Sequence, residues 1–144
     1  MNEKEQQIIS HLRKDARTSL ASISNDVKMP LSTTYDRINR LQQNQVIKKF
    51  TALVDFSKLG YHYHGKIALR ISKRHKKELL SFLQNHPAVN SLHEINNGFD
   101  FLVEVIHKDI KEYLEFIDQL HESFEIQELH QYQIIKEIEK EKFL

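Results

Sequence analysis

The chain has 144 residues, the size of one ordinary domain or two small ones, and its lack of cysteine excludes disulfides and thiolate metal sites. The charged start MNEKEQQ is no signal peptide, and no apolar run approaches the roughly 20 residues that span a bilayer, so we expect a soluble cytoplasmic protein. Residues 1–60 contain ten Lys and Arg against six Asp and Glu, and residues 61–144 contain eleven against fourteen, which indicates either two units with different partners or chance.

Two short amphipathic helices are predicted at the front of the chain. The first covers residues 3–14, with Asn2 and Glu5 forming a capping pair at its start. The second begins after Thr18 or Ser19, and Pro30 ends the segment because proline biases the preceding residue away from helix. The apolar faces of the two helices consist of Ile8, Ile9, Leu12, Leu20, Ile23 and Val27.

A third helix is predicted from Leu31 to about Gln43. At about 100° per residue, the buried stripe is expected to consist of Leu31, Tyr35 and Ile38, flanked by Leu41. The opposite face is expected to consist of Thr33, Asp36 and Arg40, with Arg37 beside them. Three short helices with a brief last turn are typical of a helix-turn-helix. The next segment, VIKKFTALVD at residues 46–55, is rich in β-branched and aromatic residues and predicts the strands of a wing.

A helix with small polar residues at its start is suited to the major groove of DNA. The candidates for contacts with base edges are Ser32, Thr33, Asp36 and Arg37. The candidates for contacts with the phosphate backbone are Arg17, Lys28, Arg40, Lys48 and Lys49. Each has a structural alternative: Asp36 and Arg40 pair on the surface, Thr33 caps the helix, and the two neighbouring lysines are turn charges.

Several segments in the right order carry a resemblance to a known family. They are DARTS at residues 15–19, the helix from Leu31, and the pairs and triplets Val46-Ile47, Phe50-Thr51-Ala52, Val54-Asp55 and Leu59-Gly60. On these residues the chain resembles the leucine-responsive regulatory protein (Lrp/AsnC) family of prokaryotic transcription regulators. The resemblance implies sequence-specific DNA binding by the front domain, and a rear domain that binds a small effector, often an amino acid, and builds dimers and octamers.

The chain departs from the family pattern at three turn positions. Lys28 stands where the family usually has glycine before the third helix, Pro30 replaces a serine, and Gln45 replaces a glycine beside Asn44. Glycine adopts left-handed backbone conformations more easily than lysine does. We therefore expect altered local turn geometry, and with it an altered register of base contacts, on an unchanged fold.

The rear half predicts the element order βαββαβ, which is typical of a ferredoxin-like domain. Strands are predicted at residues 61–71, 89–95, 99–106 and within 125–138, and helices at 74–86 and 110–124. The NNG sequence at 96–98 predicts a hairpin turn between the middle strands. Because helices cover one face of such a sheet, the other face is expected to be covered by dimerisation.

The hairpin also holds the candidate effector site. The family carries a Gly-x-x-Asp pattern there, and the resemblance places Asn97 and Asp100 at the corresponding positions, with the glycine displaced to Gly98. The alternative is that Asn97-Gly98 is only a turn and Asp100 its polar partner. His62 and His64 alternate along a strand, but no third metal ligand is identifiable, so no metal or cofactor is expected.

The sequence thus predicts an α+β protein in which a winged helix-turn-helix domain (residues 1–54) and a linker (55–62) precede a ferredoxin-like domain (63–144). The expected function is regulation of transcription, not catalysis, with double-stranded DNA, a small effector and further copies of the chain as partners. One alternative is an enzyme, because some relatives on this fold resemble decarboxylases of modified tetrapyrroles. Another is an interaction module whose DNA reader has decayed.

Overall fold

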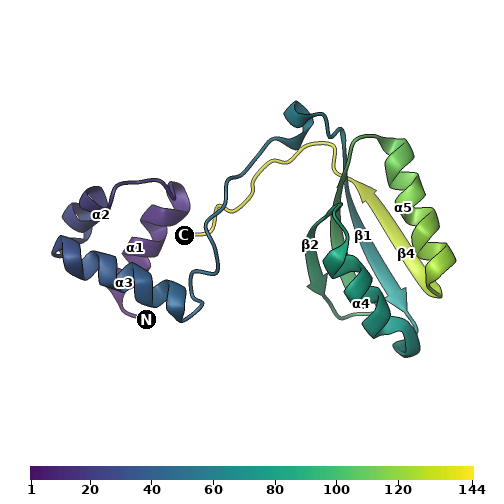
Figure 1. Ribbon diagram of the computed structural model, residues 1–144, viewed down its shortest axis with the longest axis horizontal. Helices are drawn as coiled ribbons and strands as arrows, with labels where there is room; N and C mark the ends of the chain where they lie inside the picture. The colour runs from purple at the N-terminus through teal and green to yellow at the C-terminus, as the bar shows by residue number, and fades with distance from the viewer. The chain divides into compact units, whose positions relative to one another are not determined.

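The computed structural model describes all residues from 1 to 144, and the chain divides into two compact units (Figure 1). Residues 1–53 and 138–144 form the front unit, and residues 54–137 form the rear unit. The first division lies beside the boundary predicted after residue 54. Residues 138–144, which the sequence analysis includes in the rear domain, group with the front helices. In the front unit, Arg13 Nε donates a hydrogen bond of 2.6 Å to the Phe143 carbonyl.

The three predicted front helices are present as α1 (Glu3–Lys14), α2 (Leu20–Val27) and α3 (Leu31–Gln43). The predicted capping pair is confirmed, because Asn2 Oδ1 accepts from the Glu5 N–H at 2.8 Å and Glu5 Oε2 accepts from the Asn2 N–H at 3.2 Å. Ser19 caps α2 by accepting from the Ser22 N–H at 3.1 Å. The helices enclose a small core of Ile8, Ile23, Val27 and Leu41.

The turns that lack glycine keep a left-handed backbone. Lys28 has φ 55° between α2 and α3, and Gln45, not its neighbour Asn44, has φ 59° after α3. Such a conformation costs a residue with a side chain roughly 1–2 kcal/mol. In compensation, the Lys28 and Met29 N–H groups bond the last carbonyls of α2, those of Asn25 and Ser24, at 3.3 and 3.0 Å.

The predicted buried stripe of α3 is confirmed at Leu41 and at Ile38, which packs against the same core, but it is wrong at Leu31 and Tyr35 because the buried side is rotated towards Thr34. Leu31 and Tyr35 are 53% and 56% exposed, whereas Thr34 is fully buried. The Thr34 hydroxyl donates to the Pro30 carbonyl at 3.0 Å, so its polar group is satisfied inside the helix and its burial costs little. At about 100° per residue, a buried side centred on Thr34 and Leu41 lies about 70° from the predicted stripe.

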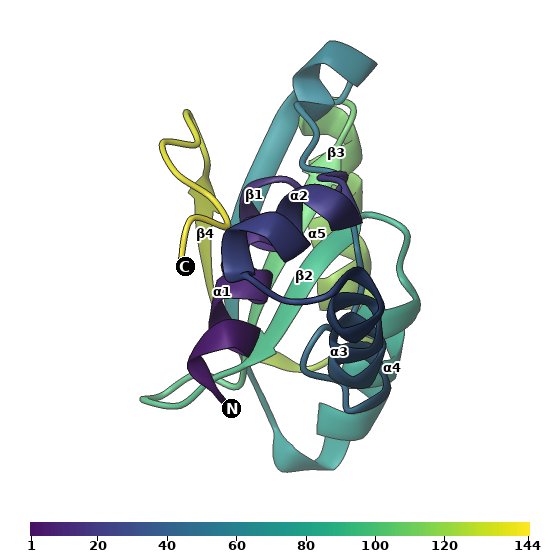
Figure 2. The same ribbon diagram turned by 90° about the vertical axis from the view of Figure 1, so that its left-hand side faces the viewer.

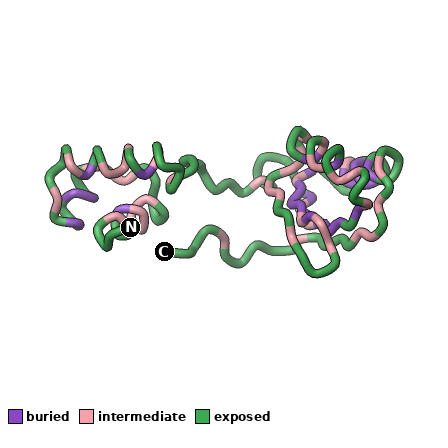
Figure 3. Tube along the Cα trace, turned by 90° about the horizontal axis from the view of Figure 1, so that it is seen from below, coloured by how far each residue is buried: buried purple, intermediate pink, exposed green.

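The predicted wing strands are absent. Residues 46–55 contain no strand, and every residue from 48 to 55 is exposed, as Figure 3 shows for the segment that follows α3. Side chains that favour strands, among them Phe50 and Leu53, project into solvent. A strand needs a partner for its backbone N–H and C=O groups, and this segment pairs with no strand of its own chain.

The rear unit has the predicted βαββαβ order and is ferredoxin-like. Its elements are β1 (Tyr63–Ile71), α4 (Lys76–Asn85), β2 (Val89–Glu94), β3 (Phe101–His107), α5 (Ile110–Ser123) and β4 (Ile126–Gln133), with short 3-10 helices η1 (Phe56–Leu59) and η2 (Lys73–His75). The strands form one antiparallel sheet in the order β2-β3-β1-β4. Both long helices lie on the same face of this sheet (Figures 1 and 2).

The core of the rear unit fills the space between the sheet and its helices. Alternate residues of β1 and β3, such as Ile67 and Val103, pack against Leu79 and Leu83 of α4 and against α5. The intervening residues face away from the helices. On this open sheet face, the register places His64, Lys66, Ala68 and Arg70 of β1 beside Leu102, Glu104 and Ile106 of β3 and Glu128, His130 and Tyr132 of β4.

Candidate functional site

The outer face of α3 is polar and accessible. Ser32, Asp36 and Arg40, three of the predicted contact residues, are exposed on it, and Thr33 is half-buried near its start. The rotation of the helix adds Tyr35, which the sequence analysis assigned to the core because its ring is apolar and its spacing helical. Asp36 and Arg40 make no ion pair with each other, so the alternative in which they pair on the surface is not seen. These side chains remain available to an external partner.

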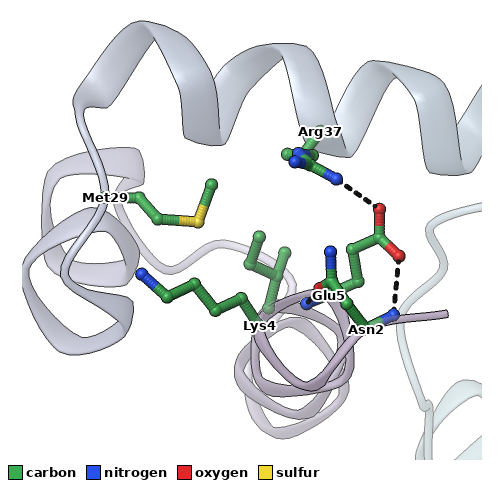
Figure 4. Close-up of a pocket in the computed structure, with 6 residues that line it drawn as sticks. Asn2, Lys4, Glu5, Met29 and Arg37 are labelled. Carbon is green, nitrogen blue, oxygen red and sulfur yellow. Dashed lines mark hydrogen bonds and ion pairs between the residues drawn. The ribbon is translucent and has the colours of Figure 1, made fainter.

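Arg37 lies on a different side of α3, against α1. Its Nη1 is 2.9 Å from Glu5 Oε1, and Figure 4 shows the guanidinium reaching from α3 to the Glu5 carboxylate. The Asn2 N–H and then the Arg37 guanidinium lower the pKa of the Glu5 carboxyl. Both side chains are less than half exposed and, with Ile8 and Met29, line a small cavity of about 30 Å³. Arg37, a predicted base contact, is thus held against α1 by a bond between helices.

The predicted phosphate-binding cations precede and follow the outer face of α3 along the chain. Arg17 lies between α1 and α2, Lys28 in the turn before α3, Arg40 in the last turn of α3, and Lys48 and Lys49 in the segment after it. All five side chains are exposed, and none of them forms an ion pair within the protein. Unpaired surface cations of this kind are free to neutralise phosphates.

The predicted effector residues lie at two levels of the hairpin between β2 and β3, at its tip and at its base. Asn97 and Gly98 have φ 68° and 95° and are exposed at the tip, as an Asn-Gly turn requires. Asp100 is half-buried, and its Oδ2 accepts from the Ile71 N–H at 2.8 Å. Its own N–H donates to the Leu69 carbonyl at 2.7 Å, so Asp100 ties the base of the hairpin to the end of β1.

Lys76 joins this hairpin although the sequence analysis did not select it. Its Nζ lies 2.7 Å from Glu94 Oε1 and 3.9 Å from Asp100 Oδ1. The hydrogen bond that this ammonium donates to the Glu94 carboxylate raises the pKa of Lys76. No sequence pattern indicates this contact, because Lys76 begins α4 and reaches the hairpin only through the tertiary fold.

His64, one of the two histidines considered as metal ligands, pairs with a carboxylate instead. His64 Nε2 lies 2.9 Å from Glu104 Oε2, and the same carboxylate accepts from the Asn90 amide and, at 3.5 Å, from the Ser91 hydroxyl. Glu104 is only 5% exposed, so these contacts satisfy a buried carboxylate on the open sheet face. No group of three or more histidine, aspartate or glutamate side chains is arranged to hold a metal ion.

A helix-turn-helix with an exposed polar face on its third helix, followed by a ferredoxin-like domain, is typical of a class of two-domain DNA-binding regulators. Residues 1–48 match the family description of a winged helix-turn-helix DNA-binding domain, and residues 67–142 match that of the Lrp/AsnC ligand binding domain. The chain belongs to the Lrp/AsnC family of transcriptional regulators. None of its helices combines the length and apolar character needed to cross a bilayer.

Individual relatives agree with this assignment. The chain is 32% identical over 116 residues to the HTH-type transcriptional regulator FL11 of Pyrococcus furiosus, a match that covers 81% of this chain and 77% of that protein. The fold superposes on the transcriptional regulator NMB0573 of Neisseria meningitidis in complex with L-Met, with TM-score 0.90, 18% identity and coverage of 100% and 96% of the two chains. It also superposes on AsnC of E. coli, with TM-score 0.84, 18% identity and coverage of 97% and 95%.

Proposed function

We propose that the outer face of α3 reads DNA in the major groove. The observation that carries this proposal is an exposed helix face with unpaired polar side chains, preceded and followed by unpaired cations. Ser32, Tyr35 and Asp36 are the candidates for base contacts, with Thr33 at the edge of the face. Asp36 is suited to accept from a cytosine amino group. Arg17, Lys28, Arg40, Lys48 and Lys49 would position the helix through phosphates.

Selection of bound fragments from a random DNA pool tests this proposal. We expect an enriched motif with two related half-sites, separated by about one helical turn or a multiple of it if the protein binds as a symmetric dimer. Recovery of no enriched motif, with weak binding that vanishes at moderate salt, would favour the alternative of a decayed DNA reader.

The effector is proposed to be an amino acid bound at the hairpin. The Neisseria relative was solved with L-Met, and the rear domain matches a ligand-binding family. Exposed Asn97 and Gly98 offer backbone N–H groups at the tip, and Lys76 lies near the base as a cation for a carboxylate. Calorimetric titration with the standard amino acids tests this, and Asn97→Pro, which removes an N–H group, should weaken binding.

Dimerisation is proposed to cover the open sheet face. Ala68 and Glu104 are already buried there in one chain, while Tyr132 at its edge is 56% exposed. Replacement of an apolar residue on this face tests the proposal, and Leu102, which is half-buried there, is suitable. Leu102→Asp should convert a dimer to a monomer in light scattering. Asp118→Lys on the outer face of α5 serves as the control and should leave the dimer intact.

We propose that the protein acts in the cytoplasm beside the chromosome and has no catalytic activity. A tetrapyrrole decarboxylase is the less favoured reading, since the polar side chains of the rear unit serve as caps and pairing partners, as Asp109 and Glu104 do. A purified protein with bound pigment absorbing visible light would support the enzyme instead.

A further inference from the structure

A cleft of about 370 Å³ opens in the rear unit, at the end of the sheet opposite the hairpin. The hairpin precedes Phe101 at the start of β3, whereas the cleft includes Ile106 and His107 at its end. Its other walls are the segment after α4, with His86, and the α5 face that carries Glu112, Glu115 and Phe116. This volume is within the roughly 300–1,000 Å³ of small-molecule sites, and the cleft is separate from the proposed effector hairpin.

Two histidine rings, those of His86 and His107, line the cleft in their uncharged form. His107 is 5% exposed, and its Nε2 is buried without a hydrogen-bond partner. The His86 Nδ1 accepts from the Ala88 N–H at 3.1 Å, which fixes the orientation of this ring. Both imidazoles pack against Phe116, at 4.8 Å for His86 and 5.5 Å for His107. Burial lowers the pKa of each ring, so neither carries a positive charge at neutral pH.

The charge of the cleft is therefore negative. Glu112 and Glu115 are its charged residues, and no lysine or arginine lines it. Glu112 Oε2 accepts from the Lys108 N–H at 3.1 Å, whereas Glu115 is exposed and makes no ion pair. A carboxylate beside aromatic faces is an arrangement that attracts ammonium groups, through charge and through the negative face of the ring.

We propose that this cleft binds a small organic amine. Its ammonium group would lie against Glu115 and Glu112, and its hydrocarbon body against Phe116 and His86. A free amino acid fits less well, because its carboxylate would meet the same two glutamates with no cation to pair with. The ligand class thus differs from the amino acid proposed for the hairpin. Each of the two proposed sites can be tested, and refuted, without the other.

Calorimetric titration of the full-length protein at pH 7.5 tests the proposal with three probes that share one body. They are 2-phenylethylamine, phenylalanine, which adds a carboxylate, and 3-phenylpropionate, which has the carboxylate alone. We expect the amine to bind at least about tenfold more tightly than phenylalanine at this site, and the acid to show no binding. No measurable binding of the amine, or equal binding of all three probes, would overturn the proposal.

Substitutions then assign the binding to the cleft. Glu115→Gln should weaken amine binding severalfold, and Glu115→Lys should invert the preference towards 3-phenylpropionate. Glu122→Gln, on the same helix but outside the cleft, is the matched control and should bind the amine as the unchanged protein does. Circular dichroism verifies that each variant is folded. Amine binding that survives both Glu115 substitutions, or that is lost in Asn97→Pro at the hairpin, would contradict the assignment.

Discussion

The Glu5 carboxylate and the Arg37 guanidinium lie 2.9 Å apart and join α1 to α3 across 32 residues of sequence. Glu5 is at the same time part of the cap of α1, through its bonds with Asn2. One side chain thus fixes the start of the first helix and the rotation of the third. Because Arg37 is held here, Tyr35 and Asp36 face outward instead.

Replacing Glu5 with Gln should release Arg37 and loosen this arrangement. We expect a lower unfolding temperature, and a steeper loss of DNA affinity with salt, by up to about one unit of the log–log slope, because a freed arginine can reach a phosphate. Differential scanning calorimetry and fluorescence anisotropy at several salt concentrations measure the two effects. Glu3→Gln, in the same first turn but away from Arg37, should change neither.

Arg40 should contribute to affinity for any DNA sequence. It is exposed in the last turn of α3 and has no partner within the protein, so Arg40→Ala should reduce the magnitude of the salt slope by about 0.9. Lys77→Ala in the rear unit removes the same charge and provides the control. A slope that Arg40→Ala leaves unchanged would remove this residue from the phosphate-binding set.

The rotation of α3 predicts an order of stabilities opposite to the one its sequence suggests. Tyr35→Ala should change the free energy of unfolding by less than about 0.5 kcal/mol, because the ring is 56% exposed. Thr34→Ala should cost about 1 kcal/mol or more, because it empties a buried position and removes the bond to Pro30. Chemical denaturation measures both. A larger loss of unfolding free energy for Tyr35→Ala than for Thr34→Ala would indicate that Tyr35 belongs to the core, as the sequence predicts.

Local chemistry in the sequence was sufficient for the limits of the helices and for the hairpin. The Asn2–Glu5 cap, the Ser19 cap and the Asn97-Gly98 turn each depend on neighbours within a few residues. The rotation of α3 was not predictable in this way, because it depends on Glu5, which lies far from Arg37 in sequence. The absence of strands at residues 46–55 has a similar cause.

Strand propensity at residues 46–55 describes side chains that suit a sheet, but only a partner strand can complete the hydrogen bonds, and the chain supplies none. The residues of the candidate site also fall into those predictable from local sequence and those placed by the tertiary fold. The exposed cations were predictable as polar surface residues, whereas Tyr35 and Lys76 became candidates only through tertiary placement.

Asp100 should matter for folding before it matters for any effector. Its carboxylate accepts the Ile71 N–H at 2.8 Å from a half-buried position, so Asp100→Ala should cost about 1–2 kcal/mol of unfolding free energy. Asp118→Ala on the exposed surface of α5 is the control and should be near neutral. Urea denaturation without effector makes the measurement. If Asp100→Ala is as stable as the control, the tie between the hairpin and β1 contributes little.

The stability of the rear unit should fall as the pH drops below about 6.5. Burial lowers the folded-state pKa of His86 and of His107, so the unfolded chain takes up protons first. Stability is therefore complete above the unfolded pKa and is lost as the pH falls through the lowered folded values. Unfolding temperatures between pH 8 and pH 5 measure this slope. His107→Phe, which keeps an aromatic ring beside Tyr113 and Phe116, should flatten it, while His121→Gln on the exposed surface of α5 should leave it unchanged.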